Sequence, residues 1–430
     1  MNKIVLKRIS ILPMTRAEDL LIEGDLLIEG DRIAYVGPPR FWPEEVEVFE
    51  GNGKVVLPGF VNAHTHLAMV FLRGFADDMA LDRWLKEKIW PMEAKLKPYH
   101  VYTFSMLGAA ELIASGVTTF ADMYFHMDRV AQAVEETGLR ASLSQGMIAQ
   151  GNPFPQEVLK RGTDFAVKFR GAAQGRITTM LAPHAPYTCP PDFLKRVREV
   201  ALKEGLPVHI HVSETNKEVE DCLMEYGVTP PELLESLGLF DCSVLAAHCV
   251  VLRDQDFFIL RKVKGVAHCP ISNLKLASGV APVPRLLDCG VNVALGTDGA
   301  SSNNRLELLQ EIKTASLLAK GVNFDPLALP AFQTLQMATL GGAKALSLEQ
   351  EIGTLEVGKK ADLVVFDFDT PHLQPCFDYY SHLVYSALPS DVHSVMVDGK
   401  WLYRDRRFET LDWERVKKEA LKATKELVQG

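Results

Sequence analysis

The stretch Gly59-Phe-Val-Asn-Ala-His-Thr-His-Leu67 governs how the rest of the chain is interpreted. It is typical of an apolar strand that ends in two histidines, His64 and His66. Residues i and i+2 of a strand project from the same face, so both imidazoles can reach one metal ion. An isolated His-x-His is more often a pair of hydrogen-bonded core histidines than a metal site, so other parts of the chain have to discriminate between the two interpretations.

The composition of the 430-residue chain is that of an ordinary globular enzyme, with 47% hydrophobic and 23% charged residues. Its length accommodates a barrel of ~250 residues plus a second module. The formal net charge is -9, and lysines and arginines are spread along the chain, so we expect neither nucleic acid nor a membrane surface as a partner. A homo-oligomer is compatible with this composition.

The cysteine content predicts a cytoplasmic location. There are seven cysteines, an odd number at scattered spacings and without a Cys-x-x-Cys pair, which favours reduced thiols over a disulfide framework. The first nine residues alternate like a strand and lack the continuous apolar core of a signal peptide. No apolar run approaches the ~18 residues that a membrane span requires.

The middle of the chain, residues 58–352, predicts an α/β fold in which apolar strands alternate with helical segments. We place the strands at residues 59–66, 116–123, 139–148, 177–183, 206–212, 243–248, 265–270 and 291–297. Eight such units are the number required for a (β/α)8 TIM barrel, and nearly continuous apolar runs suit a parallel sheet that is buried on both faces.

Both ends of the chain differ from this middle part. Residues 1–57 consist of short alternating runs broken by Gly, Asp and Pro, and residues 353–430 return to the same pattern before a final helix over 412–428. The dipeptide Asp398-Gly399 is a hairpin signal. We therefore predict a small β-sandwich domain formed from both chain termini.

Candidate metal ligands recur where a barrel places its active site, at the carboxyl ends of the strands. The polar residues at or just after the ends of predicted strands one, five, six and eight are His64, His66, His211, Glu214, His248 and Asp298. Such clustering favours a metal site over core histidines. Three imidazoles and a carboxylate suit one divalent ion, with zinc favoured and iron or another ion as alternatives.

Predicted strand four ends in Pro183-His184. A binuclear site of this kind requires a bridging group, for instance a lysine, at this position. The chain is therefore expected to bind one metal ion.

The motifs around these residues resemble those of the amidohydrolase superfamily. Within it, the chain is similar to the branch that contains 5-methylthioadenosine/S-adenosylhomocysteine deaminases and chlorotriazine hydrolases. The matching segments are Pro58-Gly-Phe-Val-Asn-Ala-His-Thr-His66, Leu72-Arg-Gly-Phe-Ala-Asp-Asp78, Ile89-Trp-Pro-Met-Glu93, His211-Val-Ser-Glu214, Ala247-His-Cys249, Ser272-Asn-Leu-Lys-Leu276 and Gly296-Thr-Asp-Gly-Ala-Ser-Ser-Asn-Asn304. The resemblance continues into the C-terminal region through residues 352–365.

The resemblance implies metal-dependent hydrolytic deamination of an adenine nucleoside, with release of ammonia and an inosine-type product. The metal ligands that it implies are His64, His66, His211 and Asp298. The catalytic residues are Glu214, His248 and Asp298, of which Asp298 takes a proton from water, Glu214 protonates the ring and His248 steadies the water. The substrate-binding residues are Glu93, His184, Glu214 and Asp298, with Glu93 as the acceptor for the ribose hydroxyls.

The resemblance leaves the substrate partly open. Deaminases that accept S-adenosylhomocysteine carry arginines near the loop after strand three, whereas this chain has Gln145 there. A neutral amide cannot replace a bidentate cation for a carboxylate, so methylthioadenosine or adenosine is expected to be the better substrate. The alternatives are another ring substrate, of guanine or chlorotriazine type, and a non-catalytic scaffold of the same fold.

Overall fold

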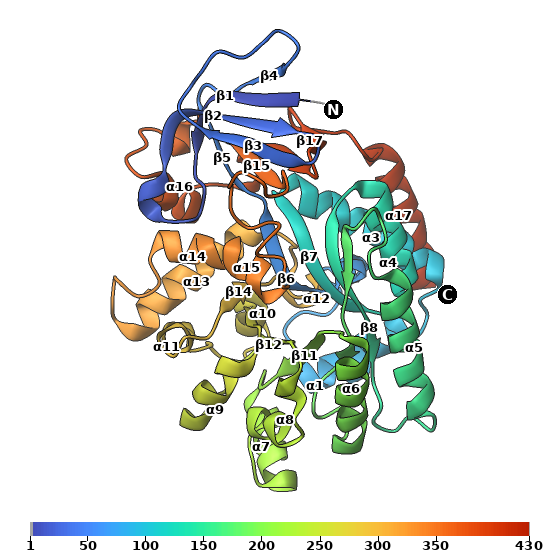
Figure 1. Ribbon diagram of the computed structural model, residues 1–430. Helices are drawn as coiled ribbons and strands as arrows, with labels where there is room; N and C mark the ends of the chain where they lie inside the picture. Colours follow the sequence, from blue (N-terminus) through green and yellow to red (C-terminus); the bar gives the residue numbers. More distant parts are fainter. Residues whose placement is uncertain (1–2, 430) are drawn as a thin grey trace.

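Parallel strands from the middle of the chain form a barrel-like ring in the computed structural model, which describes residues 3–429 (Figure 1). The strands of this ring are β6 (Phe60–Thr65), β7 (Val117–Tyr124), β8 (Arg140–Met147), β9 (Ile177–Thr179), β10 (Ala182–Pro183), β11 (Val208–Val212), β12 (Val244–His248), β13 (Gly265–His268) and β14 (Val293–Leu295). All eight predicted strand positions are present, with ends shifted by a few residues.

Two parallel sheets make up the ring, one ordered β10-β8-β7-β6 with β9 beside β8, the other ordered β11-β12-β13-β14. Parallel bridges between Leu181 and Val208 and between Thr65 and Asp298 join the two sheets at both junctions. The predicted α/β, barrel-like architecture is therefore confirmed. Predicted strand four is divided because the backbone N–H of Leu181 bonds to the carbonyl of Pro207 instead of β8.

Helices follow the strands and surround the ring (Figure 1). The longer ones are α3 (Pro98–Ala114), α4 (Met127–Thr137), α5 (Pro155–Phe169), α6 (Pro191–Glu204), α7 (Asn216–Tyr226), α13 (Leu308–Asn323) and α17 (Trp413–Gln429). The shorter ones are α8 (Pro230–Ser236), α9 (Asp254–Ile259), α10 (Pro270–Lys275), α11 (Val283–Asp288), α12 (Ala300–Asn303), α14 (Ala331–Met337), α15 (Leu340–Ala345) and α16 (Tyr379–Tyr385).

The segment between β6 and α3 arches over the end of the ring. It consists of a 3-10 helix (Leu67–Leu72), α1 (Leu81–Trp84), a π-helical turn (Leu85–Ile89) and α2 (Trp90–Glu93). We call residues 67–96 the lid segment. Its π-helical turn directly precedes α2, which ends in Glu93, and such turns are frequent near functional sites.

Strands from both ends of the chain form one nine-stranded sheet, here called the terminal sheet (Figure 1). Its members are β1 (Lys3–Ile11), β2 (Leu21–Glu29), β3 (Arg32–Gly37), β4 (Glu47–Glu50), β5 (Lys54–Pro58), β15 (Leu363–Asp367), β16 (Val392–Val397), β17 (Lys400–Arg404) and β18 (Arg407–Phe408). Asp398 and Gly399, at φ +48° and +70°, make the predicted hairpin between β16 and β17.

The terminal sheet meets the ring at the amino ends of its strands. Arg140, the first residue of β8, is buried and pairs with Asp362 at 2.7 Å and with Asp398. Strand β5 runs almost directly into β6 at the same end. The carboxyl ends of the strands, where His64 and His66 lie, are therefore left clear of the terminal sheet.

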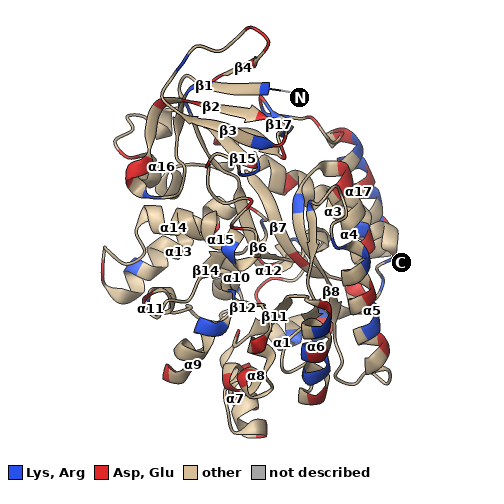
Figure 2. Cartoon of the chain, viewed as in Figure 1, with Lys and Arg blue, Asp and Glu red and all other residues tan. Residues whose placement is uncertain are grey.

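Acidic and basic side chains are interleaved along α6 and α17 (Figure 2). This pattern is typical of solvated helix faces and accords with the modest net charge of -9. None of the helices within residues 3–429 is both long enough and apolar enough to cross a membrane.

Candidate metal and active site

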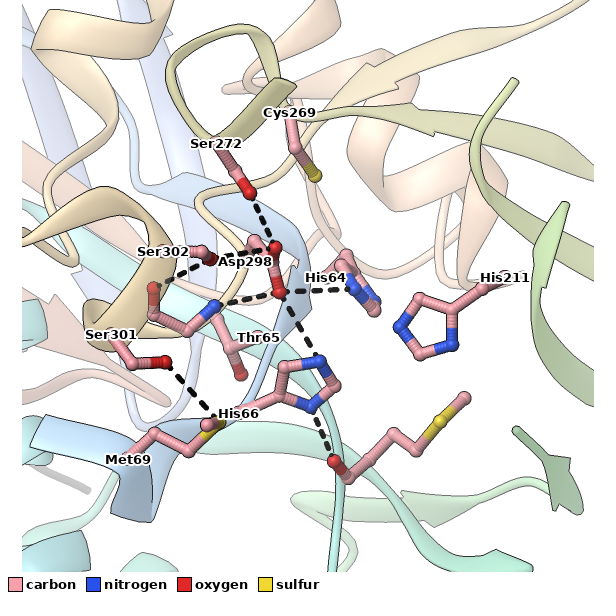
Figure 3. A network of polar contacts seen from close by, with 12 residues as sticks. His64, Thr65, His66, Met69, His211, Cys269, Ser272, Asp298, Ser301 and Ser302 are labelled. Carbon is pink, nitrogen blue, oxygen red and sulfur yellow. Dashed lines mark hydrogen bonds and ion pairs between the residues drawn. The ribbon is translucent and has the colours of Figure 1, made fainter. Parts of the chain in front are cut away.

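The predicted metal ligands lie together at the carboxyl ends of three strands (Figure 3). His64 is on β6 and His66 follows it, His211 is on β11, and Asp298 follows β14. In β11 the alternation of a strand directs His211 to one face and Ile210 to the other, where Ile210 packs in the main apolar cluster.

The distances between donor atoms suit a single cation. Oδ1 of Asp298 lies 3.2 Å from Nε2 of His66 and 3.6 Å from Nε2 of His64. Donor atoms of His64, His66 and Asp298 form one group that lies within 4.8 Å, and those of His64, His211 and His248 form another. His64 belongs to both groups. An ion about 2.0–2.2 Å from each ligand would require separations of this order.

Hydrogen bonds to the outer ring nitrogens orient three of these histidines. Nδ1 of His66 contacts the carbonyl of Met123 at 2.6 Å, and Nδ1 of His211 contacts the carbonyl of His184 at 2.7 Å. Nδ1 of His248 lies 3.0 Å from Oδ1 of Asn273. Since each Nδ1–H donates to an oxygen, each Nε2 remains free to bind a metal.

Nε2 of His64 is buried and has no hydrogen-bond partner within residues 3–429. An orphaned buried nitrogen is costly, and coordination to a metal ion would satisfy it. The residues present therefore fit a divalent ion.

Asp298 is held on both of its oxygens. Oδ2 accepts hydrogen bonds from the hydroxyls of Ser272 at 2.6 Å and Ser302 at 2.9 Å, and Oδ1 accepts one from the N–H of Gly299. The backbone of Asp298 adopts φ +60°, which is strained for a residue with a side chain. Strain of this kind persists where the surroundings fix a functional side chain.

The charges of the protein without its metal show how a cation would bind. Burial lowers the pKa of His64 to about 4. Burial also disfavours charge on His66, but the Asp298 carboxylate outweighs it and raises the pKa of His66 to about 9. Burial alone would raise the pKa of Asp298, yet the close contacts of its carboxylate with His64 and His66 hold this pKa well below its usual range. A metal ion would replace the His66 proton beside this carboxylate.

Glu214 lies next to the predicted metal site, with its Oε2 atom 3.9 Å from Nε2 of His248. Burial raises the pKa of Glu214, which favours its protonated form. The carboxylate of Glu218 accepts hydrogen bonds from the backbone N–H of Ser213 at 3.0 Å and of Glu214 at 2.7 Å. These bonds stabilise the turn at Ser213, whose φ is +51°, and thereby place the Glu214 side chain.

Glu93 and His184, the predicted substrate contacts, line one cavity together with Glu214, His248 and Asp298. Burial raises the pKa of Glu93 to about 7, although the 2.7 Å hydrogen bond that its carboxylate accepts from Tyr124 acts to lower this pKa. Burial lowers the pKa of His184 to about 3, so its ring is neutral. The cavity therefore combines hydrogen-bonding groups for a neutral, polar ligand.

Aromatic residues of the lid segment divide between this cavity and the core. Trp84 and Trp90 line the cavity. Phe71 instead stacks on Phe104, with ring centroids 4.9 Å apart, and Phe75 is exposed.

A second cavity of about 740 Å³ adjoins the first and shares Glu93 with it. Gln145, Arg161 and Asp128 are among its lining residues. Oε1 of Gln145 accepts a 3.4 Å hydrogen bond from the N–H of Met127, the first residue of α4. Lys160 and Arg161 follow Gln145 in the next helix and are the basic residues that could bind a carboxylate there. Of these two, Arg161 lines the second cavity.

Several residues around the site were not singled out from the sequence. They are Tyr124, which holds Glu93, Ser272 and Ser302, which hold Asp298, Glu218, which holds Glu214, and Asp122, which accepts hydrogen bonds from Leu67 and Thr65. Both serines lie inside motifs quoted above, whereas nothing in the local pattern marks Tyr124, Asp122 or Glu218.

A parallel barrel with histidines and an aspartate gathered at its carboxyl end is the hallmark of a class of metal-dependent hydrolases. The chain belongs to the amidohydrolase family, whose model matches residues 55–402.

Relatives along the whole chain are nucleoside deaminases by name. The chain is 52% identical over 421 residues to the 5-methylthioadenosine/S-adenosylhomocysteine deaminase of Moorella thermoacetica, a match that covers 97% of each chain. It is 50% identical to the 5'-deoxyadenosine deaminase of Methanosarcina acetivorans, over 100% of this chain and 99% of the other.

A solved structure of an adenosine deaminase from Xanthomonas campestris with bound zinc is also similar. It is 35% identical, superimposes with a TM-score of 0.95, and the match covers 100% of this chain and 99% of the other.

Proposed function

We propose that this chain is a metal-dependent aminohydrolase that converts an adenine nucleoside and water into the inosine analogue and ammonia. The observation that carries the proposal is that one cavity is lined by four groups near the proposed metal position and by two further carboxyl groups; the residues are His66, His211, His248, Asp298, Glu214 and Glu93. Names of relatives at about half identity over the full length support the same reaction.

The metal would be held by Nε2 of His64, His66 and His211 and by Oδ1 of Asp298, and the zinc bound to a similar solved structure favours zinc. When bound, such an ion supplies Lewis-acid activation of the attacking water. His248 has its free Nε2 on the same side and would accept or donate a hydrogen bond at that water.

Two carboxyl groups move the protons. Asp298 is ionised in its hydrogen-bonded site and would accept a proton from the attacking water. Burial raises the pKa of Glu214 and so favours its protonated form, from which it would donate a proton to the ring nitrogen next to the amino-bearing carbon. The proton held by Asp298 would then pass to the amino group, which leaves as ammonia, and the hydroxyl proton on the same carbon would return to Glu214 as the oxo product forms.

Glu93 and His184 would position the nucleoside. The Glu93 carboxylate can accept hydrogen bonds from both ribose hydroxyls. Nδ1 of the neutral His184 ring contacts Oγ1 of Thr188 at 2.9 Å, so His184 would offer its Nε2 atom to the substrate. The second cavity begins at Glu93 and is large enough to receive the group on the 5' carbon of the ribose.

Neutral 5' groups are the preferred ones under this proposal. Gln145 provides an amide where a carboxylate would require a cation, and the basic side chains that line the cavity within residues 3–429 are Arg161 and His126. Comparing kcat/KM for methylthioadenosine, adenosine and S-adenosylhomocysteine tests the preference, and a clear preference for S-adenosylhomocysteine would contradict it.

The test of the reaction itself is spectroscopic. Deamination converts an adenine into a hypoxanthine chromophore, so incubation of the zinc-loaded protein with adenosine derivatives should shift the ultraviolet absorbance and release ammonia in equal amounts. A protein that binds zinc but leaves the whole panel unchanged would exclude the proposal.

We also propose domain limits at residues 1–57, 58–352 and 353–430, and that the terminal sheet folds over as a small β-sandwich. Phe49 on β4 stacks on Trp401 of β17 with ring centroids 5.3 Å apart, and Arg404 pairs with Glu47 at 2.7 Å, although β4 and β17 are not neighbours in the sheet. This contact between distant strands supports two packed layers.

The same proposal extends to the setting in which the enzyme works. All seven cysteines are free thiols, which supports a reducing, cytoplasmic location. The partner is a small molecule, neither nucleic acid nor a membrane is required, and a homo-oligomer is compatible with the exposed surface.

A further inference from the structure

One of the histidines around the metal site is supported differently from the others. His66 and His211 place their Nδ1 atoms against backbone carbonyls, and His248 places its own against a side-chain amide oxygen. Nδ1 of His64 instead lies 2.8 Å from a ring nitrogen, Nε2 of His209.

His209 is positioned for this contact by β11. It lies two residues before the predicted ligand His211 on the same strand and has no solvent exposure. Its ring stands nearly perpendicular to that of His64, at 82°, with centroids 4.9 Å apart. Its other nitrogen, Nδ1, has no hydrogen-bond partner within residues 3–429, so the contact with His64 is the hydrogen bond that this ring makes there.

The chemistry of the pair fixes the direction of the hydrogen bond once a metal is bound. A neutral imidazole carries one proton, so His64 can leave Nε2 bare for a metal only if its proton is on Nδ1. That proton then points at Nε2 of His209, which must be the unprotonated acceptor. If the roles are reversed, the proton of His64 is on Nε2 and blocks coordination.

We infer that His209 is a positioning residue for the metal centre. It accepts the Nδ1–H of His64, selects the tautomer of His64 that can coordinate, and holds the ring toward Asp298 and His211. The inference rests on the proposed function in one respect, the metal site. Strand β11 would then support the ion twice, directly through His211 and indirectly through His209.

Zinc affinity, measured by competition with a chelating dye in the absence of substrate, tests the inference. His209→Phe keeps a planar ring but has no acceptor, and we expect the affinity to fall about 10- to 100-fold. His209→Gln places an amide oxygen at similar reach and should restore most of the affinity. His100→Phe is the matched control, because His100 on α3 is also buried but accepts a hydrogen bond from the N–H of Lys97, and this substitution should leave the affinity unchanged.

Two results would overturn the inference: wild-type zinc affinity in folded His209→Phe, or an equal loss in His209→Gln and His209→Phe. A wild-type protein that binds no zinc would refute the proposed function instead, so the two failures are distinguishable.

Nitrogen-15 NMR of histidines in the zinc-loaded wild-type protein gives a second test that needs no variant. We expect a protonated Nδ1 on His64 that couples across the hydrogen bond to an unprotonated Nε2 on His209. A protonated Nε2 on His209 in the zinc-loaded state would also overturn the inference.

Discussion

The phenol hydroxyl of Tyr124 donates a 2.7 Å hydrogen bond to Oε1 of Glu93. Tyr124 is the last residue of β7, whereas Glu93 belongs to the lid segment. The hydrogen bond therefore connects the lid segment to the ring. Both residues line the candidate active-site cavity. The orientation of the proposed ribose acceptor therefore depends on a strand that contributes no metal ligand.

Tyr124→Phe should raise KM for nucleosides and leave kcat nearly unchanged, because it removes an orienting hydrogen bond without touching the reacting ring. We expect a loss of about tenfold in kcat/KM. Tyr102→Phe is the matched control, since Tyr102 bonds to Glu136 at 2.6 Å on the outer helices. Equal effects of both substitutions would contradict the role of Tyr124.

The pH dependence of nucleoside binding should report Glu93. Burial raises its pKa to about 7, so the group is neutral below this pH and a carboxylate above it. Because a carboxylate is the stronger acceptor, kcat/KM should rise as pH increases through about 7. Glu93→Gln should remove this rise, and its persistence in the variant would assign the rise to another group.

The raised pKa of Glu93 also makes the free energy of unfolding depend on pH. This free energy should fall with rising pH, whereas kcat/KM should increase. A carboxyl group whose pKa is raised from about 4.3 in the unfolded chain stabilises the fold fully below that value and loses the contribution as pH rises through about 7. Denaturant unfolding of wild type and Glu93→Gln between pH 4 and pH 8 should therefore converge at the acidic end.

Glu214→Gln should lower kcat about 10²- to 10⁴-fold, the usual contribution of a general acid, with little change in KM. Metal content should stay at the wild-type level because Glu214 is not among the predicted ligands. Glu220→Gln, on the exposed side of α7, is the control and should behave like the wild type. A loss of zinc from Glu214→Gln would instead indicate that the residue supports the metal site.

Removal of the metal should lower the melting temperature by a few degrees. Strands β6 and β14 are joined near the site by the isolated bridge between Thr65 and Asp298 and by hydrogen bonds between Asn62 and Thr297, and a shared ion would reinforce this junction. Calorimetry with and without a chelator measures the effect, and added zinc should reverse it. Asp298→Asn should show a much smaller response to the chelator.

Gln145→Arg should improve kcat/KM for S-adenosylhomocysteine relative to methylthioadenosine by about tenfold, since a guanidinium can pair with the amino-acid carboxylate in the second cavity. Gln145→Met tests whether loss of the amide alone changes the ratio. An unchanged ratio in Gln145→Arg would place the 5' group elsewhere.

The barrel-like fold and the cluster at its end were predictable because both depend on periodic, local signals. Apolar runs of strand length recur between helical segments, and His64, His66, His211 and Asp298 stand at or next to their carboxyl ends. The short strand β4 is not predicted from the sequence, since its four residues Glu47-Val-Phe-Glu50 do not alternate and do not differ enough from a loop. The Asp398-Gly399 turn, by contrast, was predicted correctly, because a two-residue hairpin turn requires positive φ angles and Asp-Gly adopts them readily.

The supporting contacts were not predictable in the same way, because they join residues that are far apart in the sequence. His64 and His209 are 145 positions apart, and Tyr124 and Glu93 are 31 apart. Which side chains meet across a barrel depends on strand register, and register becomes visible only when the ring is closed.

The buried ion triplet of Arg140, Asp362 and Asp398 has a consequence for how the chain is assembled during synthesis. The two carboxylates lie 222 and 258 positions downstream of the arginine, at the far end of the chain. Until the ribosome has delivered them, β8 carries a guanidinium that cannot be buried without an uncompensated charge. The third strand of the ring can therefore reach its final environment only after nearly the whole chain has emerged, so nascent chains that stop before Asp362 should depend on chaperones.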